Sequence, residues 1–187
     1  MSEAPRVVNP AEFWAWAYSD FLSNALRGVL AEDIVAQALG GIAKPRAEWD
    51  AYELKIGTGL KIEVKSSAYL QTWEQKRHST IRFDIGMKKG WDAETNVSAL
   101  ERARAADVYI FCVFATQERA AADPLELSQW FFMVCSTRRL SQQFNTQKTV
   151  GLAALEALGL ERLRFEDLRV AVAREESGAS EDHFRNC

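Results

Sequence analysis

The spacing of hydrophobic residues changes along this chain, and the change separates predicted helices from predicted strands. Near the N-terminus apolar residues recur at helical spacing. Asn9 can cap this helix, and Pro10 suits its first position. We expect the first helix to end or kink at Gly28 and a second helix to cover 29–39. The second helix should stop at Gly40-Gly41, because glycine favours the backbone conformation that ends helices.

The middle of the chain has the period of two that is typical of strands. Residues 48–65 are predicted to form a β-hairpin around Gly57-Thr58-Gly59, since apolar and charged residues alternate from Leu60 to Lys65. A further strand is expected over 80–85. A weak helix is expected over 94–106.

Two apolar runs follow, at 107–114 and 130–135. Both are too short to cross a membrane as helices and are rich in β-forming residues, so we interpret them as strands buried on both faces. Helices are expected near 137–144 and 152–158. The segment 163–172 fits either a short strand or a helix.

The order of these elements favours one α/β domain. Strands buried on both faces need helices on either side, so the prediction is a three-layer α/β/α sandwich around a central mixed sheet. A chain of 187 residues is long enough for one such core. Residues 1–8 and about 175–187 are expected to be flexible tails, because they are polar and terminal.

Composition adds two constraints. No apolar run approaches the roughly 18 residues of a membrane span, and the three cysteines lack metal-site spacing, so we expect a cytoplasmic protein with reduced thiols and no zinc. The net charge is −3, yet residues 60–90 carry seven basic and three acidic side chains. That local excess can attract a polyanion, although a solvated charged loop is an equally simple reading.

The hairpin can bring together three charged side chains. If Gly57-Thr58 is a two-residue turn, Asp50 lies opposite Lys65, on the face that also carries Glu63. A three-residue loop would instead place Asp50 on the other face. Glu32 adds a further carboxylate, since its neighbours at helical spacing are apolar and burial of an unpaired carboxylate is costly.

These residue types suit phosphodiester chemistry. Carboxylates such as Asp50 and Glu63 are hard oxygen ligands for Mg²⁺ or Mn²⁺, and the backbone carbonyl of Val64 can add another. A bound ion lowers the pKa of its water and stabilises negative charge on phosphoryl oxygens. Lys65 can orient the attacking water or stabilise the developing charge. Taken alone, however, a Glu-x-Lys strand usually marks a solvated face or an ion pair.

The arrangement resembles the PD-(D/E)XK nuclease superfamily, which has the restriction-endonuclease-like fold. Asp50 matches the first acid of that motif, Glu63-Val64-Lys65 the second part, and Glu32 the glutamate of the upstream helix. Trp49 stands where the motif name has proline. The resemblance covers roughly residues 26–71. It implies a Mg²⁺- or Mn²⁺-dependent nuclease in which Glu32 contacts the metal directly or through a water.

Further residues are candidates for supporting and binding roles. Polar side chains follow the lysine and can contact phosphate or water, namely Ser66, Ser67 and Gln71. Cations that can hold a nucleic-acid backbone are Lys61, Lys76, Arg77, Lys88 and Lys89.

The leading expectation is therefore a DNA endonuclease of restriction or repair type, although the motif itself also fits RNA. A homodimer would supply the two sites needed to cut a duplex, but no residue indicates an interface. The alternative is an inactive nuclease fold that binds DNA or protein.

Overall fold

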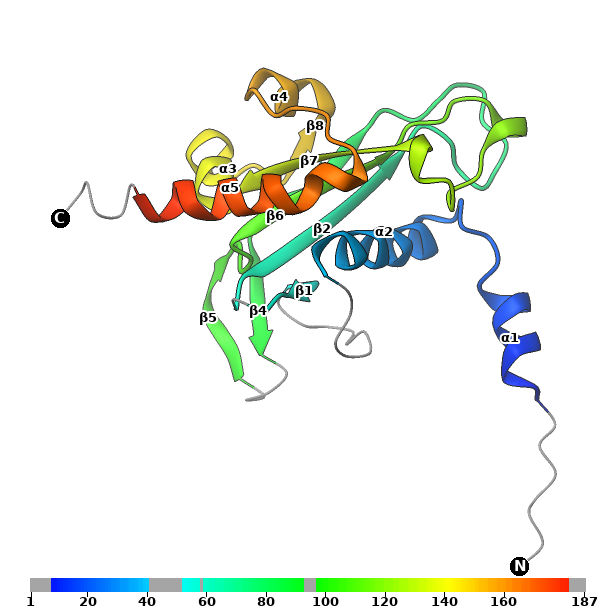
Figure 1. Cartoon of the computed structure of the whole chain (residues 1–187), viewed down its shortest axis with the longest axis horizontal. Coiled ribbons are helices and arrows are strands. Elements are labelled where there is room, and N and C mark those ends of the chain that lie inside the picture. Colours follow the sequence, from blue (N-terminus) through cyan, green and yellow to red (C-terminus); the bar gives the residue numbers. More distant parts are fainter. Residues whose placement is uncertain (1–7, 41–51, 58, 93–96, 182–187) are drawn as a thin grey trace, which may run out of the picture.

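The molecule is built on a mixed sheet of four strands in the order β1-β2-β6-β7 (Figure 1). The structure, a computed structural model, describes residues 8–40, 52–57, 59–92 and 97–181. β2 and β6 are parallel, while β1 and β7 are antiparallel to their neighbours, so the predicted mixed sheet is confirmed. The strands of this sheet are β1 (Leu54–Lys55), β2 (Lys61–Ala68), β6 (Val108–Phe114) and β7 (Trp130–Ser136).

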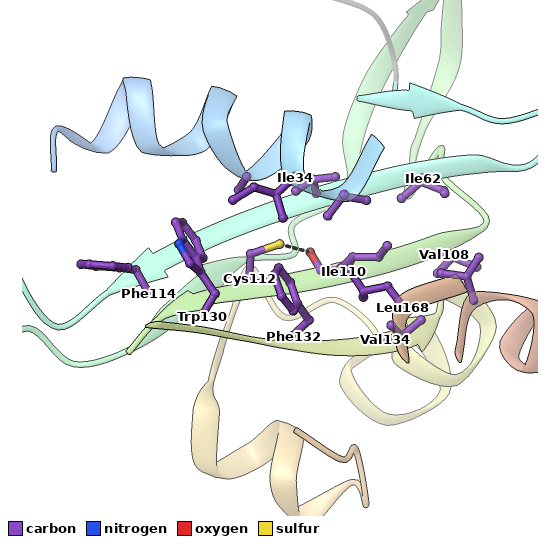
Figure 2. Packing of buried hydrophobic residues seen from close by; sticks show 14 of the residues in the cluster. Ile34, Ile62, Val108, Ile110, Cys112, Phe114, Trp130, Phe132, Val134 and Leu168 are labelled. Carbon is purple, nitrogen blue, oxygen red and sulfur yellow. Dashed lines mark hydrogen bonds between the residues drawn. The ribbon is translucent and has the colours of Figure 1, made fainter. Parts of the chain in front are cut away.

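One face of the sheet packs against two helices, α2 (Asn24–Leu39) and α5 (Leu168–Glu181). Figure 2 shows Ile34 of α2 and Leu168 of α5 packed with Ile62, Ile110 and other buried side chains of the sheet. Burial of this much apolar surface is the main favourable term in folding.

The other face is covered by shorter elements, and its buried cluster includes Phe83, Phe111, Leu140 and Leu155. Helices thus contribute to both apolar clusters, and the chain is a mixed α/β protein. The elements on this side are the two-stranded sheet of β3 (Arg82–Asp84) and β8 (Thr149–Gly151), with α3 (Thr137–Phe144) and α4 (Leu152–Ala157).

The predicted strands over 80–85, 107–114 and 130–135 are confirmed, as are the helices over 137–144 and 152–158. These segments carry their own signal, because they combine strong apolar patterning with suitable local propensity. The described residues also include three short 3₁₀ turns, namely η1 (Arg119–Ala121), η2 (Leu127–Gln129) and η3 (Phe165–Asp167).

The start of the first helix is confirmed but its end is wrong. Asn9 caps α1 (Pro10–Ala17) by accepting a hydrogen bond from Ala11 N at 2.9 Å. α1 ends at Ala17, and Ser23 caps α2, which runs through Gly28. Glycine inside a helix costs about 1 kcal/mol relative to alanine. The burial of α2 against the sheet offsets that cost, so Gly28 does not end a helix.

The helix predicted over 94–106 is wrong. The described part of this segment contains the strand β5 (Val97–Ala103), which pairs antiparallel with β4 (Lys88–Asp92). The two strands form a hairpin that extends away from the central sheet (Figure 1). Alanine, leucine, glutamate and arginine in this segment favour a helix locally, but strand pairing overrides that weak preference.

Of the two turns considered for the hairpin around Gly57-Thr58-Gly59, the structure has the three-residue loop. Lys55 pairs with Lys61, and Ile56 N donates to Leu60 O at 3.1 Å, which leaves a three-residue loop. Gly59 lies in the left-handed region at a φ of 89°, a conformation that glycine adopts without strain. β1 contains only two residues, so the described register stops short of Asp50.

The segment 163–172 contains a bridge, a 3₁₀ turn and the start of a helix. Leu163 pairs with Phe132 at the edge of β7, and α5 then continues to Glu181. Glu175 therefore belongs to a helix rather than to a tail. Its carboxylate accepts from Ser136 N at 2.8 Å and pairs with Arg139 at 3.1 Å. The single-domain organisation stays a prediction.

Candidate active site

β2 carries apolar side chains on one face and charged side chains on the other. Ile62 and Val64 pack into the cluster beneath α2. Glu63 and Lys65 project to the opposite face, where Glu63 lies directly beside Tyr109 of β6 in the strand register. The alternation that suggested these two residues from the sequence is confirmed by the strand.

Glu63 and Lys65 form a close ion pair. Glu63 Oε1 lies 2.5 Å from Lys65 Nζ, and the two side chains are only 10% and 16% exposed. A charged pair so far removed from water interacts more strongly than a surface pair, but its desolvation is costly. Such a pair is thus weak evidence for a stabilising role and better evidence for a chemical one.

A second ion pair stands next to the first. Lys88 Nζ, at the start of β4, lies 3.9 Å from Glu63 Oε1 and 3.6 Å from Asp84 Oδ2. Lys88 was predicted as a nucleic-acid contact. Asp84 was missed as a site residue, because it joins Glu63 through Lys88, and that arrangement depends on how β3 packs against β2. The spacing of Asp84 and Lys88 along the chain carries no local signal of that arrangement.

Tyr109 adds a buried phenol to this face of the sheet. Burial and the negative charge of Glu63 raise its pKa well above the ordinary value, with a smaller opposing effect from Arg104 and a smaller raising effect from Asp84. Tyr109 is therefore a neutral hydroxyl throughout the physiological range. The apolar pattern of residues 107–114 indicated only that Tyr109 lies in a buried strand.

The remaining catalytic candidates are placed differently. Glu32 is buried on α2, the helix that covers the Ile62 face of the sheet, and it interacts with other parts of the chain. Asp50 lies outside the described residues. Within the described ranges no group of three or more histidine, cysteine or acidic side chains is placed to hold a metal ion. The convergence of Glu32 and Asp50 with Glu63 and Lys65 stays a prediction.

The donors around Glu63 suit a hard divalent cation. Ile62 O accepts from Glu53 N at 3.1 Å, so it points toward β1. Successive carbonyls along a strand point to opposite sides, so the carbonyl of Val64, two residues after Ile62, points toward β1 as well. The Glu63 carboxylate and the Val64 carbonyl are both oxygen donors, which fits Mg²⁺ or Mn²⁺ rather than a thiophilic metal.

The predicted supporting residues hold the chain just after β2. Ser67 Oγ accepts from Arg82 N at 3.4 Å, and Gln71 Nε2 donates to Ala68 O and to Ser79 Oγ. Within the described part of the chain, Ser66 Oγ and Gln71 Oε1 are buried without a hydrogen-bond partner. These contacts give Ser67 and Gln71 a positioning role. Direct contact with phosphate or water stays a prediction.

The predicted cations fall into two groups. Lys61 lies on β2 with its Nζ 5.3 Å from the centre of the Tyr52 ring, and Lys89 pairs with Arg102 across the β4–β5 hairpin. Lys76 and Arg77 are exposed in the loop that follows β2, away from the Glu63 end of that strand. Lys61, Lys88 and Lys89 therefore lie on the elements that build the site.

Comparison with known proteins identifies a family for this chain. The family model described as Bacteriophage T4 endonuclease IV matches residues 16–153, which is more than half of the chain. No curated protein and no solved structure matches. In the described ranges no helix is long and apolar enough to cross a membrane.

The matched region contains the described site, including Glu63, Lys65, Asp84, Lys88 and Tyr109. It also contains Glu32 and Asp50. The chain belongs to the bacteriophage T4 endonuclease IV family and is, by that membership, a nuclease.

Proposed function

We propose that this protein is a metal-dependent DNA endonuclease of restriction or repair type, with the PD-(D/E)XK chemistry and the restriction-endonuclease-like fold. The nearly buried Glu63–Lys65 ion pair on β2 is the observation that carries the proposal. Membership of an endonuclease family supports the same reaction class. A carboxylate and an ammonium held this close, on a strand of a mixed sheet, provide a metal ligand beside a cation.

The proposed metal ligands are oxygen atoms. Glu63, Asp50 and the carbonyl of Val64 would hold Mg²⁺ or Mn²⁺, and Glu32 would contact it directly or through a water. When bound, the ion would lower the pKa of a coordinated water and stabilise charge on the phosphate.

The protein's own groups orient the reacting atoms. Lys65 Nζ carries three N–H donors, so it can hold Glu63 Oε1 and still donate to an attacking water or to a phosphate oxygen. The neutral hydroxyl of Tyr109 beside Glu63 can donate a hydrogen bond without adding negative charge near the phosphate. Bulk water has limited access to the pair, which strengthens these interactions.

Two properties of the whole protein extend the proposal. A homodimer would supply the second site needed to cut both strands of a duplex. Cys112 and Cys135 are free and buried, which suits the reducing conditions of the cytoplasm.

Plasmid cleavage tests the proposal directly. The wild-type protein should cut with Mg²⁺ or Mn²⁺ and should stop cutting in excess EDTA. Lys65→Ala and Asp50→Ala should each lose most of the activity, whereas Arg164→Ala should keep it. Arg164 is an exposed cation beyond the far edge of the sheet, and its described hydrogen bonds, both with Asp167, use its backbone N and O. Equal cleavage by all four proteins would overturn the assignment.

The second candidate function is an inactive nuclease fold that binds DNA or protein. It is favoured by the close fit of Lys65 to Glu63, which neutralises the carboxylate without a metal. Titration with Mn²⁺ separates the two functions. The nuclease should bind the ion with an affinity that falls in Glu63→Gln, whereas an inactive fold should give the same weak signal for both proteins.

A further inference from the structure

The start of β4 is held tightly against the rest of the molecule. Arg102 Nε donates to Met87 O at 3.1 Å, and Arg104 Nε donates to Ile85 O at 2.8 Å. On the other side, Gly86 N donates to Asp84 Oδ1 at 3.0 Å. Charged donors and a local turn thus hold the three residues before Lys88, which places the start of β4 near Glu63.

The two lysines near Glu63 have different freedom to move. Lys65 Nζ is 2.5 Å from the carboxylate and 16% exposed, so it is engaged and enclosed. Lys88 Nζ is 3.9 Å away, beyond hydrogen-bond distance, and its side chain is 61% exposed. Its pair with Asp84, at 3.6 Å, is also exposed and long. Lys88 can therefore turn toward a ligand at little cost, whereas Lys65 cannot.

A second pair of cations lies on the same face of β2. Lys55 and Lys61 are directly opposite each other in the β1–β2 hairpin. Residues directly opposite on an antiparallel pair share a face, and Lys61 shares its face with Glu63, the second residue after it along the strand. Like charges placed opposite each other destabilise a hairpin, and a bound polyanion would relieve that repulsion.

We propose that Lys88 binds a phosphate oxygen of a DNA strand that lies over the Glu63–Lys65 pair, and that Lys55 and Lys61 bind a neighbouring phosphate. The position of the DNA rests on the proposed function, since Glu63 and Lys65 are taken as the reacting site. The β4–β5 hairpin then acts as an arm that carries a substrate-binding lysine to the sheet. Lysine suits this role because its ammonium is a compact, mobile donor.

Salt dependence of binding tests the contact. Binding of a short fluorescein-labelled DNA, as a single strand and as a duplex, is measured by fluorescence anisotropy in EDTA at several salt concentrations. Each phosphate contact contributes about 0.7 to the slope of log K against log salt for single strands and about 0.9 for duplexes. Lys88→Ala should lower the slope by that amount, and the Lys55→Ala/Lys61→Ala double variant, which removes the contact to the neighbouring phosphate, should lower it by about as much again.

Two matched variants show whether the effect is a contact. Lys88→Arg keeps a cation at the site and should retain the wild-type slope. Arg164→Ala removes an equal charge from the far edge of the sheet and should also retain it. Thermal unfolding of every variant shows whether the fold is kept. A Lys88→Ala slope equal to that of the wild type, or no salt-dependent DNA binding by the wild type, overturns the inference.

Cleavage assays on the same proteins separate this inference from the proposed function. Wild-type protein that binds DNA with a Lys88-dependent slope but never cuts it would overturn the endonuclease and leave the contact standing. Protein that cuts in a Lys65-dependent way, with a Lys88→Ala slope unchanged from the wild type, would overturn the contact alone.

Discussion

β2 and β6 are adjacent parallel strands, paired in register from Ile62 and Val108 onward, yet they differ in kind. Every residue of β6 is buried, and its side chains contribute to both apolar clusters. β2 is apolar only on the face toward α2, and its other face carries Glu63 and Lys65. The same backbone geometry thus serves two purposes. β6 stabilises the fold, whereas β2 also holds the nearly buried charges of Glu63 and Lys65.

The largest predicted effect removes a side chain from β6. Phe111 is fully buried and its ring centre lies 4.9 Å from that of Phe83. Phe111→Ala should lower the free energy of unfolding by about 3–5 kcal/mol, because it leaves a cavity between the sheet and β3. Chemical denaturation measures the change. A loss below about 1 kcal/mol would show that β6 is less important to stability than its burial implies.

The corresponding change on β2 should affect activity. Lys65→Met keeps most of the side-chain volume and removes the charge beside Glu63. It should lower kcat/KM for DNA cleavage by about 10²–10³-fold, the size of effect seen when one preorganised electrostatic donor is lost. Steady-state cleavage rates check this. A variant that cuts at the wild-type rate would contradict a role of the Lys65 charge, and so of this face of β2, in cleavage.

Replacing both members of the ion pair sharpens the comparison further. In Glu63→Met/Lys65→Met the desolvation cost of both charges disappears and apolar volume is kept. The free energy of unfolding should stay unchanged or rise by up to about 2 kcal/mol, while cleavage is abolished. Chemical denaturation is again the measurement. A double variant less stable than the wild type would show that the pair supports the fold.

The smallest effect concerns a thiol on β7, the other neighbour of β6. Burial, with the nearby Glu175 charge, raises the pKa of Cys135 from its ordinary value of 9.0 to about 12. An acid whose pKa is raised on folding is stabilised as the neutral form. Its contribution is therefore full below pH 9 and is lost between pH 9 and 12.

Stability should consequently fall by about 1 kcal/mol from pH 9 to 10 through Cys135 alone. Denaturation curves at the two pH values check this, with Cys135→Ala as the comparison. Because the variant lacks the thiol, its free energy of unfolding should fall by about 1 kcal/mol less than that of the wild type between these pH values. An identical decrease in both proteins would assign the pH dependence to other groups.

The parts of the fold that the sequence predicted well are those with a strong local pattern. The apolar runs of β6 and β7 could hardly be anything but buried strands, and α3 begins and ends where its pattern does. The predictions at Gly28 and over the segment of β5 were wrong, because the structure there depends on contacts with other elements. Packing on the sheet carries α2 through Gly28, and pairing with β4 makes 97–103 a strand.

The site residues likewise divide into those with a local sequence signal and those without one. Glu63 and Lys65 were predictable because alternation along one strand places them together. Asp84 and Tyr109 were missed because they reach Glu63 from other strands, through contacts that no local pattern records. The sequence left the hairpin turn open between two and three residues, and in a strand a difference of one residue reverses every side chain.

The parallel pairing of β2 and β6 has a consequence for how this chain can vary. The crossover between them runs from Tyr69 to Asp107 and contains β3, β4 and β5. The longer loop from Lys61 to Asp107, which includes β2, is closed where the two strands start: Lys61 N donates to the Asp107 carboxylate, and Asp107 N donates to the Lys61 carbonyl. Doubling the length of a closed loop costs only about 0.6 kcal/mol of chain entropy. Insertions or deletions in the outer part of the β4–β5 arm are thus inexpensive, and its reach over a substrate can change while Glu63 and Lys65 stay where they are.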